Sequence, residues 1–256
     1  MKSVALRCAF VVALASVSVI AFCQGQIKHY QIPTTSMGQP TQQGLSVYLP
    51  EGYESSGRSY PTLYLVHGAF GDDTYFLDGD EASLHFNLIL ERAVREGRGR
   101  PLIAVCPNVN GIGPKLEYLR DTVIPFIDAT FRTIPNRDSR AIAGHSQGGN
   151  DAVQLAFSQP GLFSVVGGFA SYQVEFLIPK LGRIRESFDQ EAYPIRFWLY
   201  AGRHDPATIQ ANRDFSKALE EKGWPAKYAE DDGDHFSNIP QQMTEFLAYL
   251  SQSLKW

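Results

Sequence analysis

The sequence predicts an α/β fold in which a mostly parallel central sheet is covered by helices on both faces. The first observation is a set of short, continuous apolar runs at residues 62–68, 101–108 and 140–146, bounded by Gly, Pro or polar residues. Such runs are typical of strands buried on both faces. The second observation is that segments with helical spacing alternate with these runs, as they do in strand–helix–strand units.

The composition is that of one globular domain. The chain has 256 residues, of which 44% are hydrophobic and 20% charged, so it is long enough to bury a substantial core. Its net charge is −4 and no basic stripe is present, so nothing favours nucleic-acid binding. We find no internal repeat, low-complexity segment or linker, and predict a single domain over residues 24–256.

Residues 1–23 have the pattern of a secretory signal peptide. Lys2 and Arg7 precede an uncharged run from Cys8 to Cys23, which is shorter than the ~20 residues of a membrane-spanning helix. We therefore expect export, to the periplasm or outside the cell, with a lipid-modified Cys23 as the less favoured alternative. Cys106 then remains as a single cysteine, which cannot build a disulfide framework.

The remaining elements follow from apolar periodicity and from turn residues. Pro125 predicts a kink or break in its helix, and residues 171–194 form the longest connection without a clean period. In chain order we expect edge strands at 27–36 and 44–50 with a polar turn region at 37–43 between them, a strand at 62–68, a helix at 81–97, a strand at 101–108, a helix at 115–131, a strand at 140–146, a helix at 147–160, strands at 163–171 and 195–202, a helix at 208–222, a strand at 226–234 and a helix at 238–253.

The stretch "AGHSQGG" has the spacing G-x-S-x-G, formed by Gly144, Ser146 and Gly148. It follows a buried strand and precedes a helix, which is the context in which a sharp turn presents a serine hydroxyl as a nucleophile. The alternative is a glycine-rich turn in which Ser146 only caps the helix. The context favours the nucleophile.

A serine nucleophile needs a base, and a histidine after the last strand is expected in this arrangement. His235 follows Gly233 at the end of the final strand segment, whereas His204 comes too early for the order serine, acid, histidine. The alternative role for His235 is a helix-capping or solvated side chain. The remaining histidines are placed on an edge strand, at a strand end, within a helix and beside the serine pointing away from it: His29, His67, His85 and His145.

The acid is expected between the serine and the histidine, at the end of a strand. Asp205 follows the strand "FWLYAG" and precedes a helix, which it could alternatively cap. Asp231, Asp232 and Asp234 are the rivals, but they lie too close to the histidine in sequence and are expected to shape its loop. The "DDGDH" cluster lacks the spacing of a hard-cation loop, so we expect no metal.

An oxyanion hole requires two backbone N–H groups that point at the developing negative charge. Gln147, the residue after the nucleophile, supplies one. The loop "VHGAFGDD" after the early strand is expected to supply the other, from Ala69 or, as the near alternative, Phe70.

Taken together, "VYLPEGY", "YPTLYLVHGAFGDD", "AGHSQGG", "AGRHD" and "GDHFSNIPQQMTEFLAYL" resemble the putative-esterase family of α/β-hydrolases. That family includes esterase D, feruloyl esterases, siderophore esterases and antigen 85 mycolyltransferases. The resemblance implies an α/β-hydrolase fold and a serine hydrolase that uses Ser146, Asp205 and His235. Two features depart from the family pattern. Gln147 stands where many members have Met. Many members also have Trp near the early loop and after the histidine, where this chain has Tyr75, Phe76 and Phe236.

The sequence therefore predicts an exported serine carboxylic-ester hydrolase that works through an acyl-enzyme and without a cofactor. Feruloyl or acetyl esters of polysaccharides are the expected substrates, with Phe70, Tyr75 and Phe236 as substrate-binding residues. The catalytic alternatives are an acyltransferase of the antigen 85 type and a siderophore esterase. The non-enzymatic alternative is an inactive binding protein on the same fold. Apart from a small-molecule or carbohydrate-linked ester, no partner is predicted, and neither nucleic-acid binding nor a membrane span is expected.

Overall fold

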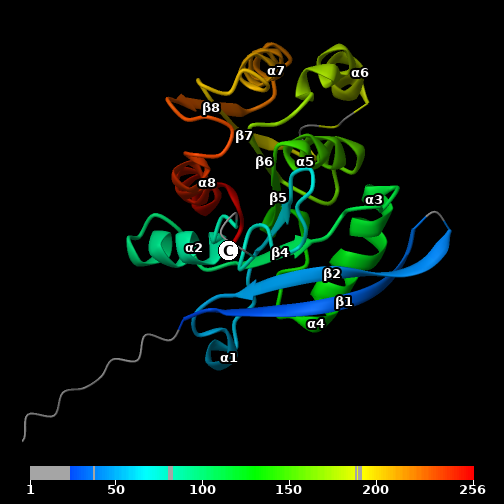
Figure 1. Cartoon of the computed structure of the whole chain (residues 1–256), viewed down its shortest axis with the longest axis vertical. Coiled ribbons are helices and arrows are strands. Elements are labelled where there is room, and N and C mark those ends of the chain that lie inside the picture. Colours follow the sequence, from blue (N-terminus) through cyan, green and yellow to red (C-terminus); the bar gives the residue numbers. More distant parts are fainter. Residues whose placement is uncertain (1–23, 37, 80–82, 188, 190–191) are drawn as a thin grey trace, which may run out of the picture.

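The computed structural model describes residues 24–36, 38–79, 83–187, 189 and 192–256. Within these residues, eight strands form one sheet in the order β1-β2-β4-β3-β5-β6-β7-β8 (Figure 1). The strands are β1 (Gln26–Ser36), β2 (Gln39–Leu49), β3 (Thr62–Val66), β4 (Ile103–Pro107), β5 (Arg140–His145), β6 (Val165–Phe169), β7 (Arg196–Gly202) and β8 (Ala226–Asp231).

The sheet is mostly parallel, which confirms the predicted fold class. Only β2 runs against its neighbours β1 and β4, whereas all pairings from β4 through β3 to β8 are parallel. Every residue of β3, β4, β5 and β6 is buried, which explains their continuous apolar runs. Because parallel strands share one direction, the loops after β3, β5, β7 and β8 all leave the sheet at the carboxyl ends of the strands. Ligands bind at this end in open α/β sheets.

The helices form a layer on each face of the sheet (Figure 1). α2 and α8 pack on one face, against one cluster of buried side chains, and α3 to α7 pack against the cluster on the other face. The helices are α1 (Tyr53–Ser56), α2 (Phe86–Arg95), α3 (Lys115–Tyr118), α4 (Ile124–Thr130), α5 (Gln147–Ser158), α6 (Leu181–Glu186), α7 (Ile209–Glu221) and α8 (Ile239–Ser253), with short 3-10 helices at Arg137–Ser139 and Val174–Lys180.

The helical segment between β4 and β5 is irregular around Pro125, as the sequence predicts. A π-helical turn, Leu119–Val123, joins α3 to α4, and Pro125 lies in the first turn of α4. Proline has no N–H to donate back into the preceding turn, so the regular hydrogen-bond pattern is interrupted at this point.

Two local predictions are wrong. Most of the region expected to be a polar turn, residues 37–43, belongs to β2, which pairs with β1 from Gln39 onward and is flanked by β4, so it is not an edge strand. Backbone pairing with β1 forms this end of the hairpin, and its side chains give little apolar alternation. Residues 171–194, expected to lack periodic structure, contain the helices Val174–Lys180 and α6, because Val174, Leu177 and Leu181 are buried on one side.

The predicted signal peptide, residues 1–23, lies outside the described residues. In the part of the chain that is described, no helix has both the length and the apolar character needed to cross a membrane.

Candidate active site

Ser146 lies at the sharp turn between β5 and α5. Its backbone has φ 56° and ψ −118°, a conformation that residues other than glycine seldom adopt. The turn is fixed from both sides, because Ser146 N donates to Phe169 O at 2.9 Å and Ser146 O accepts from Tyr172 N at 3.0 Å. The half-buried Ser146 therefore projects from a main chain that β6 and the following loop hold in place.

The glycines of the G-x-S-x-G stretch allow three backbone segments to approach one another. A Cβ on Gly148 would overlap the carbonyl oxygens of Val66 and His67, and one on Gly144 would overlap the carbonyl of Gly148. The first turn of α5 thus packs directly on the end of β3, which explains why side chains are excluded at both positions.

Asp205 and His235 come together from the ends of β7 and β8. His235 Nδ1 lies 2.6 Å from Asp205 Oδ2, and Asp205 is 3% exposed. An ionised carboxylate can only accept hydrogen bonds, so Nδ1 carries the proton and Nε2 is left as the basic nitrogen. Asp205 also accepts from Ala207 N at 3.1 Å and from the Thr208 hydroxyl, which fix the orientation of its carboxylate.

The three other aspartates around this loop make different contacts. Asp231 accepts four hydrogen bonds, from Tyr200 Oη, Gly233 N, Asn238 Nδ2 and Gln242 Nε2, at 2.8–3.0 Å. Burial raises the pKa of this carboxyl, but the hydrogen bonds outweigh burial and hold it below its usual value. Asp231 therefore fastens the start of the His235 loop to β7 and α8.

Asp232 and Asp234 lie at the surface of the same loop. Asp232 pairs with Arg203 at 3.1 Å with 83% of its side chain exposed. Asp234 accepts from the backbone N–H groups of Phe236 and Ser237, which closes a turn directly around His235. Within the described residues, no group of three or more His, Cys, Asp and Glu side chains is arranged to hold a metal ion.

The loop after β3 lies against the serine turn. A Cβ on Gly68 would lie 3.4 Å from Ser146 Cβ, so Ala69, the next residue, is a neighbour of the serine. His67 braces this loop, since its Nδ1 contacts Gly68 O at 2.8 Å and its Nε2 accepts from Val109 N at 3.1 Å. Gln147 is the first residue of α5, and its N–H has no partner within the helix.

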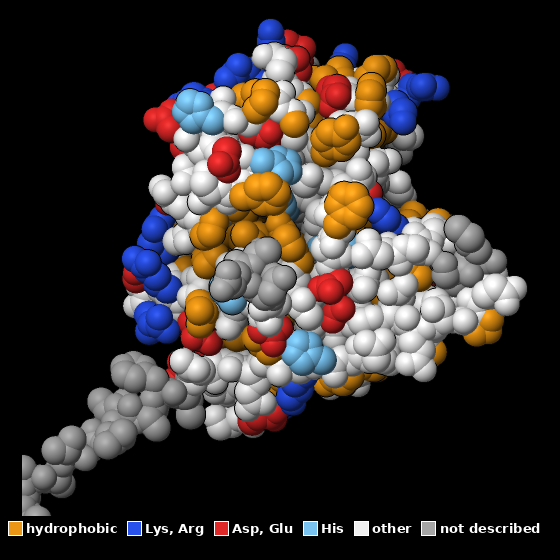
Figure 2. All heavy atoms as spheres, in the orientation of Figure 1, with side chains coloured by type: hydrophobic (Ala, Val, Ile, Leu, Met, Phe, Trp, Pro, Cys, Tyr) orange, Lys and Arg blue, Asp and Glu red, His pale blue; other side chains and the backbone are white. Residues whose placement is uncertain are grey.

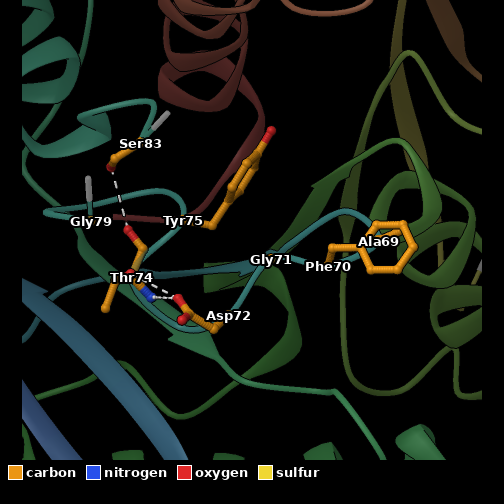
Figure 3. A pocket seen from close by; sticks show the side chains of 8 residues that line it. All are labelled: Ala69, Phe70, Gly71, Asp72, Thr74, Tyr75, Gly79 and Ser83. Atoms are coloured by element: carbon orange, nitrogen blue, oxygen red, sulfur yellow. Dashed lines mark hydrogen bonds between the residues drawn. The ribbon is translucent and has the colours of Figure 1, made fainter. Parts of the chain in front are cut away.

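A cleft of about 300 Å³ opens beside this loop and is shown in Figure 3. Asp72, Thr74 and Ser83 form a polar side, in which Thr74 donates from both N and Oγ1 to Asp72 Oδ1. The ring of Tyr75 extends away from Asp72 and Thr74. The cleft is lined by Ala69, Phe70, Gly71, Asp72, Thr74, Tyr75, Gly79 and Ser83.

The three aromatic residues expected to bind substrate differ in position. Tyr75 is half-buried and lines the cleft, whereas Phe70 is fully exposed at a positive φ of 65°. Phe236 is 59% exposed, and its ring centroid lies 4.8 Å from that of His235. Figure 2 shows hydrophobic side chains gathered near the middle of this face, next to histidine side chains.

Sequence reasoning missed the contacts of His145 and Gln147. His145, expected only to point away from the serine, contacts Tyr75 Oη at 2.7 Å and the His235 carbonyl at 2.8 Å. The side chain of Gln147 donates to Asp151, which also pairs with Lys115. No spacing in the sequence signals these contacts, because the partners are brought together only by the sheet.

The family described as "Putative esterase" matches residues 114–240, which contain Ser146, Asp205 and His235. Over these residues the chain is similar to the putative-esterase family. An esterase of Mycobacterium tuberculosis is 32% identical over 149 residues, covering 53% of this chain and 30% of the relative. An endo-1,4-beta-xylanase/feruloyl esterase of Xylanibacter ruminicola is 29% identical over 159 residues, covering 56% of this chain and 21% of the relative. The chain thus aligns with less than a third of the length of either relative.

Several solved structures share the fold over most of the chain. A ferulic acid esterase from Anaeromyces mucronatus superposes with a TM-score of 0.72, at 19% identity and with 90% of each chain covered. A fluorophosphonate-binding serine hydrolase of Staphylococcus aureus gives a TM-score of 0.71 at 18% identity, with 89% of this chain and 99% of that chain covered. At these identities the likeness establishes the α/β-hydrolase fold that the putative-esterase resemblance implies.

Proposed function

We propose that this protein is a serine carboxylic-ester hydrolase that acts through an acyl-enzyme. The observation that carries the proposal is the 2.6 Å contact between His235 Nδ1 and Asp205 Oδ2, formed at the sheet edge where Ser146 stands on its strained turn. A histidine whose Nδ1 is held by a buried carboxylate presents a basic Nε2, which is what a serine hydroxyl needs to become nucleophilic.

In the proposed reaction, Ser146 Oγ attacks the ester carbonyl carbon while His235 Nε2 takes the hydroxyl proton. The tetrahedral intermediate collapses, the C–O bond to the alcohol breaks, and His235 returns the proton to the leaving alkoxide. Water then attacks the acyl-enzyme by the same route and releases the carboxylic acid and free Ser146. Asp205 stabilises the imidazolium that forms in each half-reaction.

The developing oxyanion is assigned to the backbone N–H groups of Ala69 and Gln147. Gln147 N lies at the N-terminus of α5, where unpaired N–H groups and the helix dipole favour negative charge. The close approach of the backbone at Gly68 to Ser146, where an added Cβ would lie 3.4 Å from Ser146 Cβ, supports Ala69 as the second donor. Removing one such donor in other enzymes reduces turnover about 10²–10³-fold.

For the substrate, we infer feruloyl or acetyl esters of polysaccharides. Tyr75 gives the cleft an aromatic wall, and Asp72, Thr74 and Ser83 give it carboxylate and hydroxyl groups. Two exposed aromatic rings lie beside it: Phe70 also lines the cleft, and Phe236 packs against the ring of His235. This combination suits an aromatic or small acyl group attached to a sugar. The relative in Xylanibacter ruminicola, whose name joins xylanase and feruloyl esterase, supports the same class.

We further infer that residues 1–23 are a signal peptide and that the domain of residues 24–256 acts after export. The basic start and the uncharged run up to Cys23 support this inference. The N-terminal residue of the protein recovered from the native host's periplasm or medium tests it. Recovery from the cytoplasm with Met1 in place would contradict it.

Labelling with a fluorophosphonate probe tests the proposed function. The probe should attach to Ser146 in the native protein and should leave the Ser146→Ala variant unlabelled. A panel of aryl and sugar esters that varies the acyl group, including acetate and ferulate, then identifies the substrate class, and an added alcohol separates hydrolysis from acyl transfer. A folded protein that neither reacts with the probe nor cleaves any ester would favour a binding protein on this fold.

A further inference from the structure

Two hydrogen bonds through the buried side chain of His145 connect the wall of the cleft to the main chain of His235. Tyr75 Oη lies 2.7 Å from His145 Nδ1, and His145 Nε2 lies 2.8 Å from the carbonyl oxygen of His235. His145 is the last residue of β5, directly before Ser146, and is 1% exposed. One buried side chain therefore contacts both the cleft wall and the loop that carries His235.

The direction of each hydrogen bond follows from the acceptors. A backbone carbonyl only accepts, so His145 Nε2 carries the proton and Nδ1 accepts from the Tyr75 hydroxyl. Burial lowers the pKa of His145 to about 4 and raises the pKa of Tyr75 to about 12. Both groups are thus neutral over the range in which His235 would act as a base, and the hydrogen-bond chain keeps one arrangement throughout.

The rings of this cluster also pack on one another. The His145 ring lies parallel to that of Tyr75, with an interplanar angle of 7° and centroids 5.9 Å apart. Its centroid is also 4.7 Å from that of His235 and 5.2 Å from that of Phe236. His235 is consequently held at two points, at Nδ1 by Asp205 and at its carbonyl by His145.

We propose that His145 is a positioning residue that fixes His235 for proton transfer and links its placement to Tyr75. The proposal rests on the proposed function of Ser146 and His235 and adds a residue to which no role is assigned. His145 does not exchange a proton with substrate. Its Nε2–H sets where the main chain of His235 lies, and the Tyr75 hydroxyl keeps the His145 proton on that nitrogen.

The consequence for turnover follows from the geometry of proton transfer. A general base must lie within hydrogen-bond reach of the hydroxyl that it deprotonates, and a displacement of about 1 Å can reduce the rate about 10²-fold. Loss of the hydrogen bond to the His235 carbonyl removes one of the two points at which His235 is held. We therefore expect kcat to respond while KM for a small soluble ester stays nearly unchanged.

Four variants test the proposal. His145→Phe keeps a ring but removes the donor, His145→Gln keeps an amide N–H that can reach the carbonyl, and Tyr75→Phe removes only the hydroxyl. His204→Phe is the matched control, since His204 is exposed on the loop that contains Asp205. We expect kcat for a soluble aryl ester to fall about 10- to 100-fold in His145→Phe and about 3- to 10-fold in Tyr75→Phe, and to stay within about 3-fold in the other two.

Equal losses in His145→Phe and His145→Gln would overturn the proposal, because ring packing and not the donor would then be responsible. Unchanged kcat in a folded His145→Phe would overturn it as well. If His145→Phe does not fold, Tyr75→Phe and His145→Gln decide, and an unaffected Tyr75→Phe contradicts the proposed link.

A second readout separates this proposal from the proposed function. If the native protein reacts with neither a fluorophosphonate nor any ester, the proposed function has failed. The low-field proton resonance of His235 Nδ1–H, bound to Asp205, still reports the position of His235 by NMR. We expect this resonance to shift or broaden in His145→Phe and to persist in His145→Gln and His204→Phe. An unchanged resonance in His145→Phe would overturn the positioning role.

Discussion

Ser146 has an unfavourable backbone conformation, with a positive φ, at the end of β5 and beside β3 and β6. A non-glycine residue at positive φ costs about 1–3 kcal/mol, which the hydrogen bonds to Phe169 and Tyr172 and the packing of α5 must offset. That strain is unnecessary for a residue that only caps a helix, and Ser146 makes no side-chain capping hydrogen bond to α5. The geometry therefore favours the nucleophile over the capping role.

Replacing Ser146 with Ala should abolish turnover without unfolding the protein. Alanine keeps the Cβ and the backbone strain and removes only the hydroxyl, so the free energy of unfolding should change by less than about 1 kcal/mol. Turnover of a soluble ester should fall on the order of 10⁶-fold if the three side chains act as a unit. Steady-state rates and thermal unfolding measure the two effects, and a variant that keeps a tenth of the activity would exclude Ser146 as nucleophile.

Replacing Asp205 with Asn tests the acid. An amide at this position can accept at Oδ1 or donate from Nδ2, so it no longer fixes the proton on His235 Nδ1. In a serine protease the same change lowers turnover about 10⁴-fold, and we expect a loss of at least about 10²-fold here.

Asp232→Asn is the control for Asp205→Asn, because the Asp232 side chain is 83% exposed and should affect kcat less than about 2-fold. Asp231→Asn should act differently again. The substitution disturbs four hydrogen bonds at the root of the His235 loop, so it should lower thermal stability more than Asp232→Asn does. An active Asp205→Asn beside an inactive Asp231→Asn would reassign the acid.

At the scale of the elements, α5 can begin where it does only because its first turn has no side chain facing β3. Gly148→Ala would push a methyl group into the backbone carbonyls of Val66 and His67. Overpacking of this kind costs about 1–3 kcal/mol, and moving α5 also moves Gln147 N and the Ser146 turn. We expect a loss of stability of that size, together with a fall in kcat, measured by urea unfolding and ester hydrolysis.

Gly161→Ala is the matched control for Gly148→Ala. Gly161 follows α5 in the chain, and nothing lies within 4 Å of a Cβ added there. This substitution should change neither stability nor kcat appreciably. If Gly148→Ala proves as stable and as active as Gly161→Ala, α5 does not rest on β3 in the way described.

The elements show which parts of the fold can be predicted from sequence. β3, β4, β5 and β6 are fully buried, so they appear as apolar runs. The start of β2 carries polar residues in a paired hairpin, and backbone hydrogen bonds leave no trace in side-chain pattern. The spacing of Val174, Leu177 and Leu181 does indicate a helix. The regular helical pattern is broken, however, because Val174–Lys180 is a 3-10 helix that contains Pro179.

For the whole molecule, the candidate site is assembled where the carboxyl ends of four strands meet, after β3, β5, β7 and β8. The order serine, aspartate, histidine and the strand ends predicted that Asp205 and His235 would lie together, and the two side chains are 2.6 Å apart. The contact between Tyr75 and His145 was not predictable, because it joins residues 70 positions apart through the packing of a loop on the sheet. The sequence carries the chemical groups, and the sheet determines their partners.

The same packing makes stability depend on pH. Burial lowers the pKa of both His67 and His145, the latter to about 4, so the folded protein keeps these rings neutral while the unfolded chain takes up protons near pH 6.5. The unfolded state then binds more protons below that pH. The stabilisation is fully present above about pH 6.5 and is lost progressively as the pH falls towards 4.

We therefore expect the free energy of unfolding to fall between pH 6.5 and 4.5, with a share of up to about 3 kcal/mol from His145 by pH 4. Urea unfolding of the native protein and of His145→Gln across this range measures that share. Gln does not titrate, so the variant should lose less stability on acidification, even if it is less stable at pH 7. His204→Phe removes an exposed histidine and should keep the native slope. Equal slopes in the native protein and His145→Gln would mean that His145 is free to protonate in the folded state, which the hydrogen bonds to Tyr75 and to the His235 carbonyl oppose.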